Sequence, residues 1–287
     1  MSFRNLSRKY GISTAAAHGK VIEYFKKLPH VADVTRKYCT KFSGILLTDG
    51  TYIGINSVGK KVPVIYGVDY NTHDIPTFKL AKSESYLACK EFFASCNLSG
   101  YPLSMLVSDD NPNIYEACRY IYGNSYHQLC HNHFKQSIRL KLGLSSRDRT
   151  HIKFMREIET ILGHKRSLTD FNQRAAKITK NYTSNQLYSE ILISIAHRQD
   201  ELLAFHHHRG TPLTTNLIES YNKHLKSRTR SLCYFEDFTH AKLWLNAYFL
   251  HRRSKVFTDC RGKFKHLNGK TSLSKTKKSN MDTPMFF

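Results

Sequence analysis

The first half of the chain contains short apolar runs of the length typical of β-strands. Residues 44–55 and 61–70 are rich in β-branched and aromatic residues, a third run follows at 75–81, and only short polar segments separate the three. This spacing predicts three antiparallel strands joined by short connections. Two further apolar runs, at 103–110 and 125–133, predict a fourth and a fifth strand.

Segments with helical spacing separate the last three strands. In the segment 83–100, Tyr86 and Phe93 fall on one helix face, and Pro112 stands in the first turn of the next predicted helix, 111–123. The resulting order is βββαβαβ. Three hairpin-linked strands followed by crossovers through helices predict an α/β fold with a mixed sheet and helices on its faces, which is the topology of a ribonuclease-H-like core.

The pattern changes after this sheet. Residues 134–210 show helical spacing with charged faces and no strand pattern, which predicts an all-helical insertion. Residues 211–258 contain two more helical patterns, and we expect them to complete the core that begins with 40–133. Residues 259–287 are rich in Lys, Ser and Asn and poor in apolar residues, so we predict a basic, disordered tail.

The N-terminal residues 1–38 predict a partial helix-turn-helix-like DNA-binding segment. A short helix is followed by Gly11, which suits a turn that needs a positive φ, and Ser13 or Thr14 can cap a longer second helix. An ordinary pair of antiparallel helices is the alternative interpretation.

The composition is strongly basic. The chain has 44 Lys and Arg residues against 22 acidic ones and a formal net charge of +22, which indicates a polyanionic partner, most often nucleic acid. No apolar stretch approaches the length of a membrane-spanning helix, and the N-terminus lacks an apolar signal region, so we expect an intracellular protein. The seven cysteines are irregularly spaced and form no CxxC motif, which argues against a disulfide framework.

Three acidic residues occupy positions that suit metal chemistry. Asp49 lies within the first predicted strand, Asp109 at the end of the fourth, and Glu219 near the start of a basic helix. Because strands one and four are adjacent in the proposed sheet, the two aspartates converge, and neighbouring carboxylates repel unless cations lie between them. Oxygen ligands suit Mg²⁺ or Mn²⁺, and two such ions about 3.5–4 Å apart can activate an attacking oxygen and stabilise a leaving one.

Each of these acids also has an ordinary structural interpretation. Asp49 precedes a glycine, as in many turns, and Asp109 or Asp110 can cap the helix that follows. Asn216 and Glu219 have the spacing of a capping box. Taken together in a basic chain, the three acids favour a metal-dependent site that acts on a phosphodiester.

Basic residues follow the third acid along its helix. We expect Lys223, Lys226, Arg228 and Arg230 to contact DNA phosphates and hold the DNA against the metal ions; a solvated basic face is the alternative.

The fifth predicted strand ends in a cluster of metal-binding residue types. Cys130 and His133 have the spacing of half a zinc site, but no second half accompanies them. We therefore expect Cys130, His131 and His133 to order the site through hydrogen bonds.

Four sequence motifs resemble those of DDE transposases of the mutator supergroup, over about residues 40–255. They are TDGTYI with Asp49, LVSDD with Asp109, CHNH with Cys130 and His133, and TTNLIESYNKHLKSR with Glu219. The resemblance implies that the three acids hold two Mg²⁺ or Mn²⁺ ions, and that Cys130 and His133 form the family's Cys-His motif. It also implies a ribonuclease-H-like core with a helical insertion, cleavage of DNA at element ends and transfer of the 3′-hydroxyl to target DNA.

The chain departs from this pattern in two places. The second motif usually reads Asp-Gly, whereas here it is Asp109-Asp110, so that Asp110 is a rival ligand. The N-terminal DNA-binding part is short for the family, as in a truncated copy.

The expected function is that of a transposase on double-stranded DNA, working as a homo-oligomer and without a membrane partner. We expect it in the cytoplasm with the nucleoid, or in the nucleus of a eukaryotic host. The alternatives are an inactive or truncated transposase-derived DNA-binding protein, a metal-dependent nuclease without strand transfer, and an RNA-binding or ribosomal protein.

Overall fold

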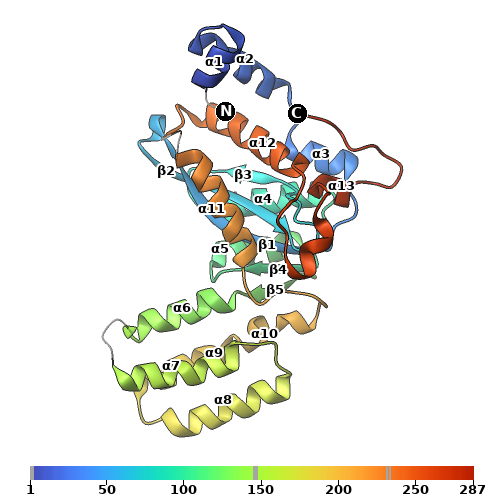
Figure 1. Ribbon diagram of the computed structural model, residues 1–287. Coiled ribbons are helices and arrows are strands. Elements are labelled where there is room, and N and C mark those ends of the chain that lie inside the picture. The colour runs from blue at the N-terminus through green and yellow to red at the C-terminus, as the bar shows by residue number, and fades with distance from the viewer. Residues whose placement is uncertain (1–2, 145–147, 231, 233) are drawn as a thin grey trace.

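The computed structural model of the protein describes residues 3–144, 148–230, 232 and 234–287. Within these residues, the centre of the molecule is a five-stranded mixed sheet with the order β3-β2-β1-β4-β5 (Figure 1). The strands are β1 Ile45–Ile55, β2 Lys60–Asp69, β3 Phe78–Leu80, β4 Met105–Ser108 and β5 Tyr126–Leu129. The mixed α/β sheet predicted from the sequence is confirmed.

The pairing of β1 decides where the acidic residues lie. On one side β1 pairs antiparallel with β2, and on the other side it pairs in parallel with β4. The antiparallel pair is a hairpin closed by η1, Asn56–Val58, and by Gly59, whose φ of +68° suits glycine. The predicted adjacency of strands one and four is therefore confirmed.

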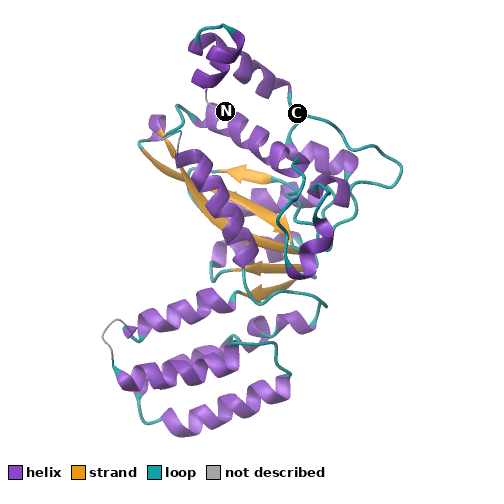
Figure 2. Cartoon of the chain, in the orientation of Figure 1, coloured by secondary structure: helices purple, strands orange, loops and turns teal. Residues whose placement is uncertain are grey.

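Helices cover both faces of the sheet (Figure 2). One face carries α11, Asn216–Arg230, and α12, Phe238–Ser254; the other carries α4, Tyr86–Leu98, and α5, Pro112–Ile121. Leu47 of β1 packs in one core with Ile218 of α11, and the next residue back, Leu46, packs in the other core with Phe92 of α4. β1 is buried on both faces from Ile45 to Thr48, so the next residue, Asp49, places a carboxylate at the edge of the buried part of the strand.

The segment between β5 and α11 is a helical unit with a core of its own. It consists of α6 His131–Lys141, α7 Arg149–Leu162, α8 Leu168–Tyr182, α9 Gln186–His197, α10 Gln199–Leu202 and η3 Ala204–His206. Phe134, Phe154 and Ile191 are buried in this core together with Leu129 of β5, so the unit is anchored directly on the last strand of the sheet.

Two helices at the N-terminus form a hairpin at the end of the molecule opposite the helical unit (Figure 1). These are α1, Phe3–Tyr10, and α2, Thr14–Lys27. Gly11 has a φ of +61°, and the Ser13 side chain caps α2 by accepting a hydrogen bond from the Ala16 amide. The local turn chemistry predicted from the sequence is present.

A third helix, α3 Val31–Tyr38, was not predicted, and it belongs to the core. Val31 and Val34 are buried in the same cluster as β1. The prediction of one DNA-binding segment over residues 1–38 is therefore wrong at its C-terminal boundary, because α3 gains its stability from tertiary packing and has little helical signal of its own.

The prediction of a disordered tail at 259–287 is wrong. This segment contains η4, Gly262–Leu267, and α13, Ser272–Thr276, and it buries Leu267 and Leu273 completely. Two β-bridges, Val256 with Thr271 and Cys39 with Lys277, tie it to the rest of the chain.

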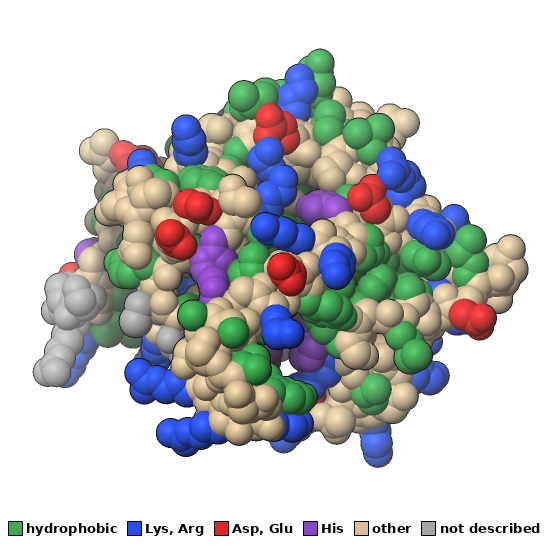
Figure 3. Space-filling view, turned by 90° about the horizontal axis from the view of Figure 1, so that it is seen from above, with side chains coloured by type: hydrophobic (Ala, Val, Ile, Leu, Met, Phe, Trp, Pro, Cys, Tyr) green, Lys and Arg blue, Asp and Glu red, His purple; other side chains and the backbone are tan. Residues whose placement is uncertain are grey.

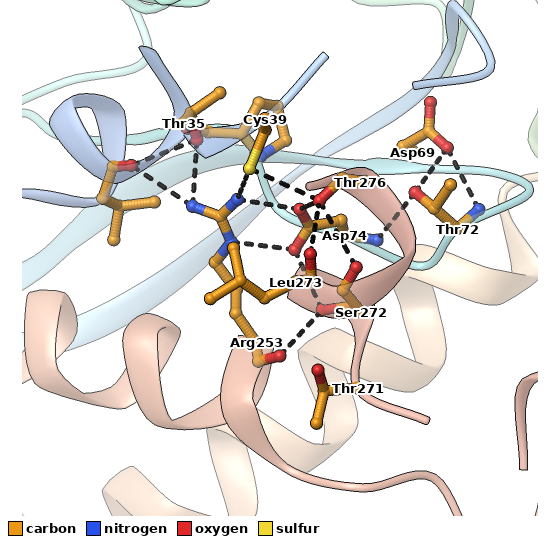
Figure 4. A network of polar contacts seen from close by, with 12 residues as sticks. Thr35, Cys39, Asp69, Thr72, Asp74, Arg253, Thr271, Ser272, Leu273 and Thr276 are labelled. Atoms are coloured by element: carbon orange, nitrogen blue, oxygen red, sulfur yellow. Dashed lines mark hydrogen bonds and ion pairs between the residues drawn. The ribbon is translucent and has the colours of Figure 1, made fainter. Parts of the chain in front are cut away.

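Buried polar contacts hold this tail in place (Figure 4). Arg253 and Asp74 are both fully buried and form a bidentate ion pair, with the Asp74 oxygens 2.8 Å from Nε and 2.7 Å from Nη2. The hydroxyls of Thr276 and Ser272 in α13 donate to the same carboxylate at 2.6 and 2.9 Å. Burial opposes ionisation of Asp74, but the Arg253 guanidinium outweighs it and holds the pKa of the carboxyl below its usual value.

Three strands are shorter than predicted. The fourth spans Met105–Ser108 where 103–110 was expected. The third spans Phe78–Leu80 where 75–81 was expected. The fifth ends at Leu129 where 125–133 was expected, because Cys130 stands at the N-cap of α6. Among the described residues, the helices lack the length and apolar content that crossing a bilayer requires.

Candidate metal and DNA site

Asp49 and Asp109 lie level with each other on neighbouring parallel strands. Leu47 of β1 pairs with Val107 of β4, and two residues further on the two chains reach the two aspartates. Asp49 is still within β1, whereas Asp109 directly follows the last residue of β4. The sheet therefore brings together two acids that are 60 positions apart in the sequence.

The charges of these acids act on one another. Burial and the charge of Asp109 raise the pKa of Asp49 to about 6, and Glu219 adds to the increase while His133 opposes it. Burial also raises the pKa of Asp109, again against the charge of His133. The Asp109 Oδ1 atom is buried without a hydrogen-bond partner. A buried carboxylate oxygen of this kind fits a cation.

The third acid, Glu219, reaches the site from the first turn of α11. Its Oε1 accepts a hydrogen bond of 2.9 Å from the Thr215 hydroxyl. One helical turn later, Asn222 donates from Nδ2 to Asp49 Oδ2 at 2.7 Å, while its Oδ1 accepts from the Tyr66 hydroxyl at 2.7 Å. Asn222 thus links α11 to β1, and the sequence interpretation missed it because a lone Asn carries no motif.

The ordinary roles considered for Asp109 and Asp110 are not the ones observed. Asn111 caps α5, with its side chain accepting from the Asn113 amide. Asp110 turns away and forms an ion pair with Arg198 of the helical unit, at 2.6 Å. Of the two adjacent acids, Asp109 is the one that shares the environment of Asp49.

The capping box considered for α11 is replaced by other contacts. The side-chain Oδ1 of Asn216 accepts from Nδ2 of Asn132 at 3.0 Å, and the Glu219 carboxylate accepts from the Thr215 hydroxyl.

Cys130 and His133 influence each other's ionisation beside the acids. Burial opposes ionisation of the Cys130 thiol, but hydrogen bonds from His133 and Thr215 outweigh it and hold its pKa below the ordinary value. The hydrogen bond to Cys130 raises the pKa of His133 to about 9 against the effect of its burial. His133 is therefore a cation at neutral pH. Thr215 contacts Cys130 at 3.3 Å and also Glu219, so this pair supports the loop that delivers the third acid.

His131, the remaining member of this motif, serves the helical unit instead. It is buried, and its two ring nitrogens lie 2.9 and 2.8 Å from the carbonyl oxygens of Leu162 and Leu202.

The acids suit a divalent metal by their chemistry, since hard carboxylate oxygens prefer Mg²⁺ or Mn²⁺. Asp49 and Asp109 fit such an ion, because their like charges face each other and one oxygen is unpartnered. Within the described part of the chain, no group of three or more His, Cys, Asp or Glu side chains is already arranged to hold a metal ion. Glu219 points its carboxylate at Thr215 instead.

The predicted DNA-contacting residues of α11 are all exposed, but they do not share one surface. Lys226 and Arg230 line a groove of about 560 Å³, named here the basic groove, which also includes Lys61. Arg228 lies on the side of α12: burial raises the pKa of Tyr248 in that helix, and the charge of Arg228 opposes this shift. Lys and Arg side chains are spread over the face of the molecule seen from the α1–α2 end (Figure 3).

Comparison with known proteins gives one result that spans the site. The sequence matches the protein family described as "Transposase, Mutator family" over residues 29–252. The match runs from just before α3 to near the end of α12 and includes all three acids, Cys130 and His133. No curated protein sequence matches the chain well enough to serve as a named relative.

Proposed function

Because the chain belongs to the Mutator family of transposases, we propose that it is a DDE-type transposase whose metal ligands are Asp49, Asp109 and Glu219. The proposed reaction is metal-dependent cleavage of DNA at the ends of an element, followed by transfer of the 3′-hydroxyl to target DNA. One observation carries the proposal: Asp49 in β1 and Asp109 directly after β4 lie level on adjacent parallel strands, and α11, which carries Glu219, is joined to Asp49 through Asn222.

The fold supports this proposal. The order β3-β2-β1-β4-β5, with two antiparallel pairings, two parallel crossovers and α11 packed across β1, is the arrangement expected of a ribonuclease-H-like core. The helical unit lies between the second and third acids in the sequence, so it can differ without disturbing the sheet that positions Asp49 and Asp109.

The residues of this chain have separate tasks in the proposed reaction. Mg²⁺ or Mn²⁺ at the acids would lower the pKa of an attacking water or 3′-hydroxyl and stabilise the leaving oxygen. Asn222 holds Oδ2 of Asp49 and leaves its other oxygen for the metal. His133 places a positive charge where phosphate would arrive. The basic residues of α11 hold the DNA backbone.

Substitution of single acids tests this proposal. In a Mg²⁺-dependent cleavage assay on DNA carrying the element ends, we expect Asp49→Asn, Asp109→Asn and Glu219→Gln each to reduce cleavage at least a hundredfold while DNA affinity stays within about threefold. Asp110→Asn is the matched control, because its carboxylate pairs with Arg198 and should leave cleavage unchanged. Full cleavage by the Glu219→Gln variant would remove that residue from the site.

The same preparation separates transfer from simple hydrolysis. DNA ends that are already cleaved and carry a free 3′-hydroxyl should be joined to a target duplex. Cleavage without joined product would instead identify a metal-dependent nuclease.

A further inference from the structure

The basic groove lies beside the candidate metal site but is not part of it. It has a volume of about 560 Å³ and is open to solvent. Its lining includes Tyr52, Gly54, Lys61, Lys226, Arg230 and Phe235. The groove therefore joins β1, β2, the last turns of α11 and the segment that follows α11.

The charges in the groove have one sign. Lys61, Lys226 and Arg230 are exposed, and its lining contains no acidic side chain. Three cations that converge on one concave surface, in a chain of net charge +22, favour a ligand with several negative charges. A strand of nucleic acid has this property along its backbone.

Two half-exposed aromatic rings flank the same groove. Tyr52 is 46% exposed and Tyr234 is 49% exposed. The Tyr234 ring lies directly over Gly54, where any side-chain carbon would collide with it. Every nucleic-acid base presents a flat face on which such rings stack.

The groove is connected to the acids along two elements. β1 runs from Asp49 to Gly54, and α11 runs from Glu219 to Arg230. A hydrogen bond to Glu84, together with burial, raises the pKa of Tyr52 to about 12. The charges of Asp109 and Asp49 add to this shift, so the Tyr52 phenol borders both the acids and the basic groove.

Among the described residues, β1 has no strand partner on its β4 side between Leu47 and Ile55. β4 pairs with β1 from Ile45 to Leu47, and a bridge joins Ile55 to Phe235. This stretch of β1 runs from Asp49 to Gly54, which lines the groove.

We propose that the basic groove binds one unpaired deoxynucleotide of the DNA substrate, with its base against Tyr52 and Tyr234 and its flanking phosphates on Lys61, Lys226 and Arg230. An unpaired base is favoured over a duplex, because only an unpaired base exposes a flat face on which the two rings can stack. This inference rests on the proposed function, because it assigns the groove to the same DNA whose phosphodiester reaches the acids.

Binding measured without metal tests the inference separately from the chemistry. The full chain in EDTA is titrated into two labelled DNAs, a blunt duplex and the same duplex with an unpaired 2-aminopurine nucleotide at one end. We expect tighter binding to the second DNA and quenching of its 2-aminopurine as the base stacks. Tyr52→Ala should weaken binding to the unpaired end about tenfold and abolish the quenching, with little effect on the blunt duplex.

Matched variants guard against a folding artefact. Tyr52→Phe keeps the ring and loses only the hydrogen bond to Glu84, so it should retain binding and quenching. Gly54→Ala should displace the Tyr234 ring and reduce quenching. Lys61→Ala should weaken binding, whereas Lys60→Ala, an exposed neighbour outside the groove, should not.

Two results would overturn the inference: equal affinity of the wild-type chain for both DNAs, or equal weakening of both by Tyr52→Ala. Failure of the proposed function gives a different pattern, in which the preference for the unpaired end remains but the acid variants still cleave.

Discussion

At the scale of single residues, the site depends on groups that carry no charge. Asn222 is buried and makes one hydrogen bond to Asp49 and one to Tyr66. Because the Tyr66 hydroxyl donates to its carbonyl oxygen, the amide must present its NH₂ group to the carboxylate. The orientation of the first acid is therefore set by a chain of three side chains.

We expect Asn222→Ala to raise the Mg²⁺ concentration needed for half-maximal cleavage about tenfold, because residues that orient a metal ligand typically change metal affinity by this much. Tyr66→Phe should have a smaller effect in the same direction. The measurement is cleavage rate against Mg²⁺ concentration, with saturating metal restoring most of the rate.

Two variants elsewhere serve as controls for this prediction. Asn246→Ala removes a buried amide that bonds the backbone of Val31 and Pro29, and Tyr101→Phe removes a buried hydroxyl that bonds Asp69. Both should lower stability without moving the Mg²⁺ dependence. A shift of similar size in the controls would mean that Asn222 acts only through general stability.

His73 makes the fold sensitive to acid. Burial, together with the nearby charge of Arg252, lowers the pKa of His73 to about 4, and the ring packs against Phe264. The unfolded chain takes up this proton near pH 6.5 and the folded chain only near pH 4, so the free energy of unfolding should fall as the pH decreases between these values. The loss should approach about 3 kcal/mol.

His73→Asn provides the comparison, since Asn tolerates the φ of +58° found at this position. Urea unfolding at a series of pH values should give a flatter profile for the variant between pH 6.5 and 4. Parallel profiles for the two proteins would show that other groups cause the acid sensitivity.

At the scale of elements, strands were predictable where hydrophobic pattern and local turn chemistry agree. The β1–β2 hairpin, the helices after β3 and β4 and the adjacency of β1 and β4 all follow from such local signals, and so does the convergence of Asp49 and Asp109. Side-chain contacts between distant helices and strands were not predictable. Asn222 meets Asp49 across 173 residues, and nothing in its immediate sequence marks it.

The prediction of a disordered tail at 259–287 was wrong for the same physical reason. Its composition is that of a disordered segment, but α13 donates two hydroxyls to a carboxylate that sits some 200 positions earlier and is already paired with Arg253. The composition of a segment does not reveal an interaction of this kind, because the partners are ordinary residues in separate elements.

We expect Asp74→Asn to lower the free energy of unfolding by about 3–5 kcal/mol, because it leaves the Arg253 charge buried without its counter-ion. Asp33→Asn is the control at an exposed Asp–Arg pair of similar length, 2.7 Å, and should change stability little. Urea denaturation measures both. Equal effects of the two substitutions would contradict the structural role given to Asp74.

At the scale of the whole molecule, the acidic site and the excess of basic residues lie in different places. The sheet and its helices place the acids in a partly buried site, while a surplus of cations is spread over the surface (Figure 3). The chain belongs to the Mutator family of transposases, so DNA is the expected partner of these surplus cations.

We expect affinity for duplex DNA to fall steeply with salt, by about a thousandfold or more between roughly 50 and 200 mM, because bound protein releases counter-ions from the phosphates. Lys226→Ala should reduce the slope of log affinity against log salt by about one. Fluorescence anisotropy at several salt concentrations measures this slope, and a flat response would contradict electrostatic binding.

The packing of α13 over Asp74 also determines what a truncating mutation would do to the protein. A stop codon after α12 would spare every acid and every DNA-contacting residue discussed above, yet it would remove the two hydroxyls from a fully buried ion pair and uncover the groups around it. The truncated protein would keep its acids and its DNA-contacting residues but lose the packing that holds them in position. Proteolysis, rather than altered chemistry, would then silence the copy.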